Sequence, residues 1–252
     1  MGESLKRIRA DLHVHTVVSP CASVEMIPPL IVRHAVNEGI NWIAITDHNS
    51  TANIEAVIRA AKGSDLAVIP GVELQTLEEV HVLALFDTLD QARQIQRIID
   101  NHLPGLANNI DFFGEQFIVD HTGEFIARED RMLISSLTLG FSELSRIIPD
   151  LGGVFIPAHV NRKSNGLFQT LGFISPDDKI DALEISRHIS VEDCHLTYPQ
   201  TRDYPVIQNG DVHNLDDFLG NTFFHVSEPS VLELRKALKN LDGRTFEVVN
   251  SN

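Results

Sequence analysis

The segment DLHVHTVVSPCAS, residues 11–23, contains two histidines one residue apart and, six positions after the second, a cysteine. In a strand, residues two apart point to the same side, so His13 and His15 present their imidazoles together, with Asp11 on the same face. Imidazole is a common ligand of transition metals. From this segment alone, a metal site and a plain polar strand face are both open interpretations.

Further histidines and carboxylates lie beside other apolar runs of the sequence. They are Asp47, His48, Glu73, His81, His159, Asp211 and His213. All lie at or near the carboxyl end of a run except His81, which lies near the start of its run. Parallel α/β folds place their active sites at the carboxyl ends of strands. Because a buried histidine or aspartate without a partner is costly, the pattern favours pairing or metal binding over packing.

The elements that must position these residues are short apolar runs separated by amphipathic segments. The runs are typical of buried parallel strands and span residues 42–48, 66–74, 80–86, 152–160, 181–186 and 204–213. Helices are predicted at 28–39, which begins with two prolines and ends on Gly39, and at 53–63, which ends on Gly63. This order predicts βαβ units, repeated around a barrel or across an open sheet.

Residues 104–150 interrupt this pattern. They predict a hairpin that turns at residues 121–123, followed by a helix. We interpret this part as a hairpin and helix insertion on the barrel face. No internal repeat or low-complexity linker is visible, so a single domain spanning residues 1–252 is predicted.

Composition narrows the classes of partner. The 20 basic and 35 acidic residues give a net charge of −15, which repels polyanions, so no long nucleic acid is expected as a partner. No apolar stretch is long enough to span a membrane and no secretory signal is visible, so no membrane partner and a cytoplasmic location are expected. Two cysteines are too few for a disulfide framework.

Taken together, the motifs resemble the PHP (polymerase and histidinol phosphatase) superfamily. The residues that carry the resemblance are His13-Val-His15, Asp47-His48, Glu73, His81, His159 and Asp211-Val-His213, in order along nearly the whole chain. The fold that the resemblance implies is a distorted, TIM-like (β/α)7 barrel with a metal site at the carboxyl ends of its strands.

The resemblance also implies two or three divalent metal ions, of zinc, manganese or iron. The implied ligands of the first ion are His13, His15, Glu73 and Asp211. Those of a second ion, bridged through Glu73, are His81 and His159, and those of a third are His48, His213 and the residue at position 21.

Position 21 departs from the family pattern. In the histidinol phosphatase branch it is a histidine, whereas this chain has Cys21. A thiolate is a good ligand of zinc but a poor one of manganese or magnesium. Cys21 is therefore a candidate ligand of a third ion, and a small packed residue beside a two-metal site is the alternative.

Such a site suits hydrolysis of phosphoesters by attack of a metal-bound hydroxide. The predicted substrates are small phosphomonoesters or nucleotide-like phosphodiesters, a nucleotide or short oligonucleotide included. Asp211, His159 and Glu73 are the predicted catalytic residues. Cations that follow strand ends are predicted to bind the substrate phosphate, namely Arg162, Lys163 and Arg187.

Two alternatives to a phosphoesterase stay open at this stage. One is a non-catalytic regulatory domain that kept the PHP fold. The other is hydrolysis of a C–N bond, as in the related amidohydrolase barrels, which commonly use a carboxylated lysine at a strand end, whereas no strand predicted here ends in lysine. Glu184, at an inward position of its run, is either a support for a ligand histidine or a structural carboxylate.

Overall fold

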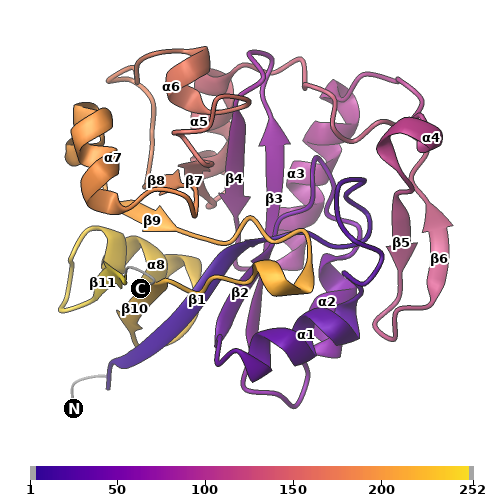
Figure 1. The fold of residues 1–252 in the computed structure, drawn as a ribbon, viewed down its shortest axis with the longest axis horizontal. Helices are drawn as coiled ribbons and strands as arrows, with labels where there is room; N and C mark the ends of the chain where they lie inside the picture. The colour runs from indigo at the N-terminus through magenta and orange to yellow at the C-terminus, as the bar shows by residue number, and fades with distance from the viewer. Residues whose placement is uncertain (1–3, 250–252) are drawn as a thin grey trace.

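The computed structural model of the protein describes residues 4–249 (Figure 1). Its main sheet has seven strands in the order β11-β10-β1-β2-β3-β4-β7. These strands are β1 (Lys6–Val14), β2 (Trp42–Ile45), β3 (Ala67–Gln75), β4 (His81–Leu85), β7 (Val154–Pro157), β10 (Thr222–Val226) and β11 (Thr245–Val248). A parallel pair is formed by β8 (Leu183–Ile185) and β9 (Val206–Gln208), and a hairpin by β5 (Phe117–Val119) and β6 (Phe125–Arg128).

The strands that carry the motifs do not all run in the same direction. Strands β1, β2 and β3 are parallel, whereas β4 is antiparallel to both β3 and β7. The prediction of a parallel strand at residues 80–86 is therefore wrong. Only five residues join β3 to β4, which is too short for a crossover helix, so the chain reverses. Because of this reversal, His81 at the start of β4 pairs with Gln75 at the end of β3.

The sheet curls, and the pair β8-β9 bridges its two sides. On one side, backbone hydrogen bonds link β7 and the residues after it to the β8 segment, from Asp181 N to Phe155 O and from Val160 N to Glu184 O. On the other side, Val212 N donates to His13 O at 2.9 Å. The α/β class with a curled sheet is confirmed, whereas an exact (β/α)7 repeat is not, because β3 and β4 are joined without a helix and β10 and β11 extend the sheet.

The inside of the curl is filled by apolar side chains that include Leu12, Leu83 and Ile156. Helix α8 (Val231–Leu238) contributes to the same cluster, together with Ile8 near the start of β1. Trp42, at the start of β2, contacts Phe224 of β10 edge to face. Helix α8 contacts β10 and β11, and β10 pairs with residues 6–10 of β1, so this helix packs beside the first half of β1 and away from the end that carries the histidines.

Helices cover the outside of the sheet. Helices α1 (Pro28–Asn37) and α2 (Ile54–Ala60) pack in one cluster with β2, and α3 (Leu89–His102) and α5 (Phe141–Asp150) pack in another with β4. Helix α3 begins after Thr88, whose hydroxyl accepts a hydrogen bond from Gln91 N in a capping box. The shorter helices are α4 (Ile110–Phe113), α6 (Leu167–Thr170) and α7 (Val191–Thr197), with 3₁₀ turns at Pro199–Asp203 and Leu215–Asp217.

Residues 104–150 contain α4, the β5-β6 hairpin and α5. The hairpin turns at residues 120–124, where Gly123 has a positive φ of 90°. Helix α5 packs against β7 in the outer apolar layer. The prediction of a single domain with an insertion over these residues stays a prediction. None of the helices within residues 4–249 has the length and hydrophobicity that crossing a bilayer requires.

Candidate metal centre

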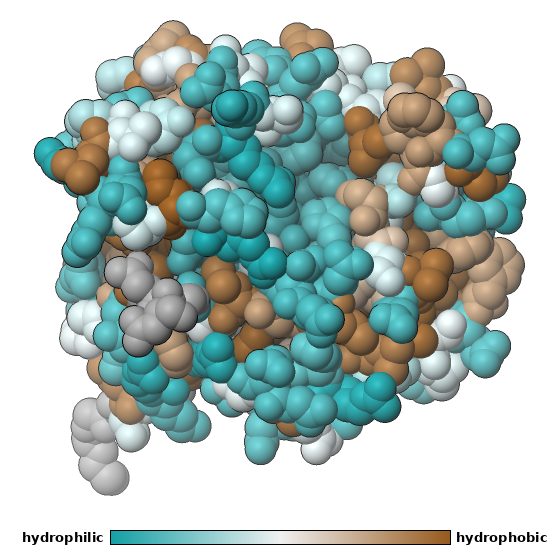
Figure 2. Space-filling model, viewed as in Figure 1, coloured by the Kyte–Doolittle hydropathy of each residue, from teal (hydrophilic) through white to brown (hydrophobic). Residues whose placement is uncertain are grey.

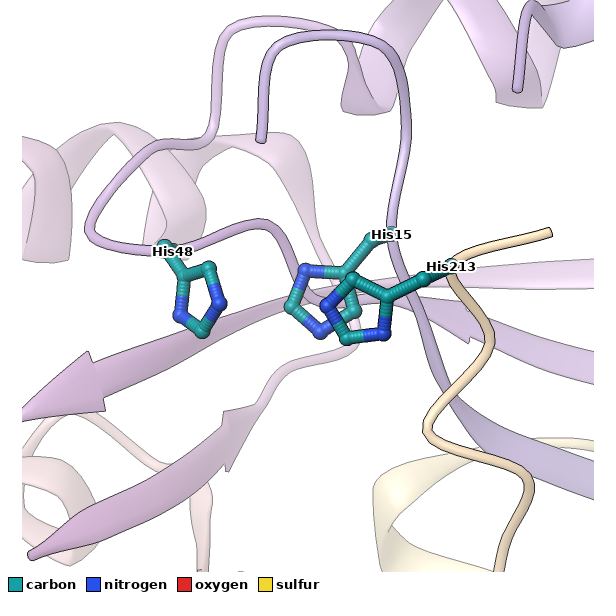
Figure 3. Close-up of side chains that lie close together, drawn as sticks. All are labelled: His15, His48 and His213. Carbon is teal, nitrogen blue, oxygen red and sulfur yellow. The ribbon is translucent and has the colours of Figure 1, made fainter. Parts of the chain in front are cut away.

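Strands β1, β2 and β3 run in the same direction, which brings three motifs to one edge of the sheet. Beyond the end of β2, Glu73 N donates to Asp47 O at 3.1 Å, and Asn49 N donates to Glu73 O at 2.8 Å. This short parallel bridge places His48 beside Glu73. The residues after β9 pair with the end of β1 and bring His213 over it, so that His15, His48 and His213 converge from three segments (Figure 3).

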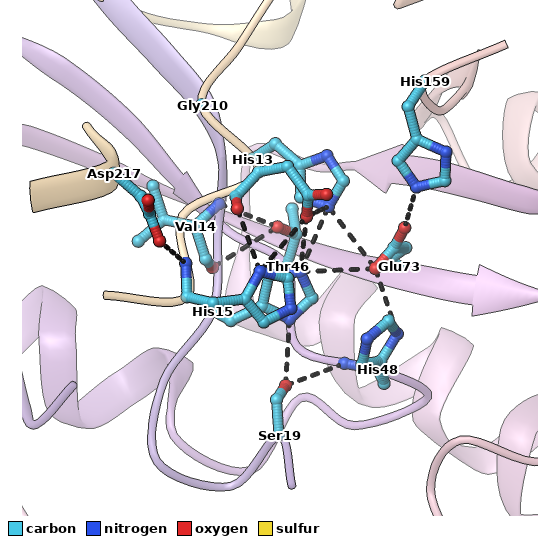
Figure 4. Close-up of polar contacts among 12 residues, drawn as sticks. His13, Val14, His15, Ser19, Thr46, His48, Glu73, His159, Gly210 and Asp217 are labelled. Carbon is cyan, nitrogen blue, oxygen red and sulfur yellow. Dashed lines mark hydrogen bonds and ion pairs between the residues drawn. The ribbon is translucent and has the colours of Figure 1, made fainter. Parts of the chain in front are cut away.

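Glu73 lies at the centre of the cluster, and its two carboxylate oxygens face ring nitrogens of five histidines. Figure 4 labels four of them, His13, His15, His48 and His159. The Oε2 atom lies 3.0 Å from His48 Nδ1, 3.3 Å from His15 Nε2 and 3.4 Å from His13 Nε2. The Oε1 atom lies 2.8 Å from His81 Nδ1 and 3.1 Å from His159 Nε2. All six side chains are almost completely buried.

Several buried polar atoms in the cluster have the arrangement of ligands around an ion. Glu73 Oε2 accepts no hydrogen bond from the residues that the structure describes, although three imidazoles surround it. The Nε2 atoms of His13 and His15 face each other at 3.1 Å. Three groups have ligand atoms within 4.8 Å of one another: His13, His15, Glu73 and Asp211; His48, Glu73 and His81; and His15, His48 and His213. Imidazole and carboxylate together suit divalent transition metals.

Hydrogen bonds on the far sides of the rings fix their orientation. His13 Nδ1 lies 3.0 Å from the carboxylate of Glu184, which also accepts hydrogen bonds from Asn209 Nδ2 at 2.7 Å and His159 N at 2.9 Å. His213 Nδ1 lies 2.9 Å from the carbonyl oxygen of Asp211. Both contacts leave Nε2 available as a ligand. Of the two interpretations of Glu184, the contacts therefore favour support of a ligand histidine.

Burial and charge act against each other in this cluster. Burial lowers the pKa of His13, but the charges of Glu184, Glu73 and Asp211 outweigh this effect and raise the pKa well above its usual value. Burial raises the pKa of Glu73, but nearby histidine charges hold it well below its usual value. Because the pKa values of His13 and His48 are raised in this way, metal binding must displace protons from these histidines.

The loop that carries Asp211 is held by Asp11. Its carboxylate accepts hydrogen bonds at 2.9 Å from the backbone nitrogens of Gly210 and Leu219. A Cβ atom at Gly210 would lie 2.8 Å from this carboxylate and 2.5 Å from the carbonyl oxygen of Asp217, so only glycine fits. Asp211 and His159 adopt positive φ values of 51° and 30°, a strained conformation that is typical of functional sites.

The structure brings together eight of the nine predicted metal ligands, because each belongs to a group above or contacts Glu73. The ninth, Cys21, is exposed as a residue, and its thiol makes hydrogen bonds to His48 and His213. Neighbouring protein atoms desolvate the thiol and raise its pKa, but the charges and hydrogen bonds of these histidines outweigh that effect and lower the pKa to about 5. Its role as a ligand stays a prediction.

The predicted phosphate-binding cations differ in position. Arg162 and Arg187 line a cavity of about 300 Å³ that also reaches His159, Asp211 and His213. Arg162 Nη1 lies 2.6 Å from Asp211 Oδ2, and Arg187 Nη1 lies 3.0 Å from Asp217 Oδ1. Lys163 is exposed and does not line this cavity. On the face drawn in Figure 2, hydrophilic side chains gather around a hollow near the middle, and hydrophobic ones are more frequent near β5 and β6.

Residues that hold the ligands were largely missed by the sequence analysis. Asn209 accepts a hydrogen bond from Leu12 N and donates one to Glu184, while Ser186 lines the cavity. For Asn209 a signal existed, because a polar residue at an inward position of an apolar run needs a buried partner. For Ser186 no such signal exists, because loop residues follow no periodicity.

The sequence model of the PHP domain matches residues 11–154, more than half of the chain. The chain therefore belongs to the PHP domain family, and the resemblance drawn from its motifs is confirmed. The class predicted from the motifs, a hydrolytic enzyme of the phosphoesterase type, is consistent with this membership.

The chain is similar to two known proteins in sequence and to one solved structure in fold. The chain is 24% identical to the uncharacterised Bacillus subtilis protein YqxK, over 95% of this chain and 64% of YqxK. It is 39% identical to the 5′-3′ exoribonuclease Rnm of Salmonella typhimurium over 80 residues, which cover 30% of this chain and 26% of Rnm. The fold is similar to that of the lesion-specific endonuclease PfuEndoQ from Pyrococcus furiosus, with a TM-score of 0.75 and 22% identity over 96% of this chain and 58% of that one.

One comparison corrects the expectation about partners. A structure of endonuclease Q holding a 27-mer duplex with an abasic lesion at its active site matches 95% of this chain and 58% of its own, with a TM-score of 0.71 and 23% identity. The expectation that the chain has no long nucleic acid as a partner is contradicted by this likeness. Net charge describes the whole surface, whereas a polyanion responds to the local field, and two arginines line the cavity beside the histidine cluster.

Proposed function

We propose that this chain hydrolyses phosphodiester bonds of nucleic acid in a metal-dependent reaction. The observation that carries the proposal is the convergence of five histidines on Glu73, at the wall of a cavity that holds two arginines. The substrate class is supported by the nucleases among the similar proteins. Since the chain spans only part of those proteins, their particular substrates are not transferred to it.

The buried cluster provides the ligands, and the cavity provides the substrate contacts. Bound divalent ions would lower the pKa of a water molecule and neutralise charge on the phosphoryl oxygens. His13, His15, Glu73 and Asp211 would hold one ion, and Glu73 with His81 and His159 a second. Both Asp211 and His159 also line the cavity, so the ions and the phosphate would meet there.

Arg162 is the cation that we propose for the scissile phosphate. Its guanidinium is 46% exposed and makes an ion pair with Asp211 through Nη1. A guanidinium has five N–H donors, so the remaining ones are available for phosphate oxygens. Arg187 lies against Asp217 on another part of the cavity wall, where it would contact a neighbouring phosphate of the same strand.

Cleavage of labelled oligonucleotides tests this function. The substrates are a single strand, the matching duplex and the same duplex with one abasic site, each incubated with metal-free protein and with protein supplied with Mn²⁺ or Zn²⁺. Cleavage is expected only with metal, and Asp211→Asn is expected to reduce its rate at least about 100-fold, as loss of a charge-stabilising group commonly does.

Glu247→Gln is the matched control, because it removes one charge from an exposed ion pair with Arg7 on β1 and should leave the rate unchanged. Equal rates for Asp211→Asn and the natural protein would contradict the assignment of the site. Absence of cleavage for every nucleic acid, with metal shown to be bound, would contradict the proposed substrate class.

A further inference from the structure

Ser19 is a buried residue that contacts two candidate metal ligands at once. It lies four residues after His15 and is completely buried. Its Oγ atom lies 3.0 Å from His15 Nδ1 and 3.2 Å from the backbone nitrogen of His48 (Figure 4). The same atom lies 2.7 Å from Asp47 Oδ1. Nothing in the sequence motifs or in the similar proteins assigns a role to this hydroxyl.

The direction of these hydrogen bonds follows from Asp47. Its carboxylate can only accept, and it is surrounded by donors: Thr16 N at 2.6 Å, Thr16 Oγ1 at 2.8 Å and Ser19 Oγ at 2.7 Å. The single hydroxyl proton of Ser19 therefore goes to Asp47. The Ser19 oxygen must then accept from its other two neighbours, the His48 N–H group and His15 Nδ1. Neutral His15 accordingly carries its proton on Nδ1 and its lone pair on Nε2.

This tautomer leaves Nε2 as the atom through which His15 can bind an ion. His15 belongs to two of the candidate groups, yet one lone pair can bind only one ion. Its Nε2 atom lies 3.1 Å from His13 Nε2, 3.3 Å from Glu73 Oε2 and 3.5 Å from Asp211 Oδ1. It therefore completes the group with His13, Glu73 and Asp211. A second ion bound by His48 and His213 would then need another third ligand. The Cys21 thiol makes hydrogen bonds to both of these histidines.

We propose that Ser19 is a positioning residue that fixes the Nδ1–H tautomer of His15 and thereby assigns this histidine to the ion held with His13, Glu73 and Asp211. Asp47 orients the hydroxyl. The inference rests on the metal binding in the proposed function but not on cleavage of any substrate. Both measurements below therefore need no substrate, and they can succeed or fail independently of nuclease activity.

The first measurement is the tautomer of His15 in the metal-free natural protein. Long-range ¹H–¹⁵N NMR correlations distinguish the two ring nitrogens, and the spectrum is recorded at a pH above the titration of the histidines. The proton is expected on Nδ1. A proton on Nε2 would overturn the proposal without any variant being made.

The second measurement is zinc affinity, determined by competition with a chromophoric chelator. Ser19→Ala is expected to weaken the tightest zinc binding 10- to 100-fold, as loss of a hydrogen bond to a ligand histidine commonly does, and to change the His15 spectrum to mixed tautomers. Ser19→Thr keeps the hydroxyl and is expected to restore both properties. Ser145→Ala is the control, because Ser145 is equally buried but lies on α5 and bonds to Ser142 O.

A Ser19→Ala protein with unchanged zinc affinity, or with weaker affinity but an unchanged His15 tautomer, would contradict the proposal. Circular dichroism and thermal unfolding show whether each variant is folded. If Ser19→Ala does not fold, the tautomer in the natural protein decides the question.

Discussion

At the scale of residues, the candidate site depends on one carboxylate. Glu73 faces five histidines through two oxygens, and although burial raises its pKa, nearby histidine charges hold this pKa well below the usual value. Each of these histidines comes from a different strand or loop except His13 and His15. A single side chain therefore joins the candidate groups into one centre, so substitutions at separate ligands should not be independent of one another.

Arg162→Ala tests the phosphate contact. Loss of a charge-assisted hydrogen bond of about 1.5–3 kcal/mol is expected to raise KM about 10- to 100-fold for oligonucleotide cleavage. Arg93→Ala is the control, because Arg93 is also exposed and ion-paired but lies on α3, outside the cavity. Steady-state kinetics measure both variants. An unchanged KM for Arg162→Ala would contradict the phosphate contact of Arg162 and would indicate Arg187 or Lys163 as the phosphate-binding cation.

Cys21→Ser tests the third ligand group. The lowered pKa of Cys21, about 5, means that the thiol is ionised at neutral pH, and a thiolate binds zinc strongly. Loss of one bound zinc per chain is expected, measured by metal analysis after dialysis. Cys194→Ser is the matched control, because Cys194 is buried in an apolar cluster away from the histidines. Equal zinc content in both variants and the natural protein would make Cys21 a packing residue.

The site residues that could be named from the sequence are histidines and carboxylates that recur beside apolar runs. His13, His15 and Asp211 could be named because histidines and carboxylates beside apolar runs are costly unless they are paired or bound to metal. Ser19 could not be named, because a serine in a loop is an ordinary residue until its buried partners are known. The His15 tautomer likewise depends on a contact with Asp47 that sequence spacing does not encode.

At the scale of elements, the site exists because the carboxyl ends of β1, β2 and β3 and the amino end of β4 lie at one edge of the sheet. The reversal between β3 and β4 brings His81 next to Gln75, and the strained φ values at His159 and Asp211 turn two loops inward. The positions of β2, β3 and β7 and of helices α1 and α2 follow from hydrophobic runs and glycine or proline signals. The direction of β4 and the presence of β10, β11 and α8 were not predicted, because long-range pairing decides them.

Helix α8 offers a test of stability away from the site. Glu233 is buried, and its carboxylate accepts hydrogen bonds from Arg244 Nε and Ser227 N, both at 2.9 Å. Glu233→Gln removes the negative charge that faces the Arg244 guanidinium. The free energy of unfolding at pH 7 is expected to fall by about 3 kcal/mol, as when one partner of a buried pair is removed. Urea unfolding measures it, with Glu247→Gln as the exposed control, where about 0.5 kcal/mol or less is expected.

The same pair predicts a pH dependence. Burial raises the pKa of Glu233, but the hydrogen bonds from Arg244 and Ser227 outweigh this effect and lower it to about 2 in the folded protein. Because the folded pKa lies below the ordinary value of 4.5, the stabilisation is fully present above pH 4.5 and is lost as the pH falls towards 2. The difference in stability between the natural protein and Glu233→Gln should shrink over this window. A constant difference would show that the charge is not what stabilises α8.

At the scale of the whole molecule, the chain and its proposed nucleic-acid substrate both carry a net negative charge. The chain has a net charge of −15, so the nucleic-acid substrate proposed for it would have to be attracted by a local field. Sequence composition could not predict this, because it sums charges over the surface, whereas the buried cluster and two arginines lie together at one cavity.

Metal loading should stabilise the entire fold. An ion at 100 times its Kd adds about 2.7 kcal/mol, which for a chain of this size raises Tm by about 5–10 °C. The gain should decrease as pH falls, because the raised pKa values of His13 and His48 mean that protons compete with the ion. Scanning calorimetry with and without Zn²⁺ or Mn²⁺, after removal of metal with a chelator, measures both effects. If added metal leaves the Tm unchanged at every pH, metal binding by the cluster would be contradicted.

The pairing of β1 with β10 has a consequence for how the protein is made. Residues 6–10 pair with residues 222–226, so one side of the strand that leads into His13 and His15 has no partner until more than 200 further residues have left the ribosome. Contacts of such large sequence separation form late, and an unpaired strand edge is prone to associate with other chains. During translation, the strand that leads to the metal ligands is therefore the part of the nascent chain that most needs protection from aggregation.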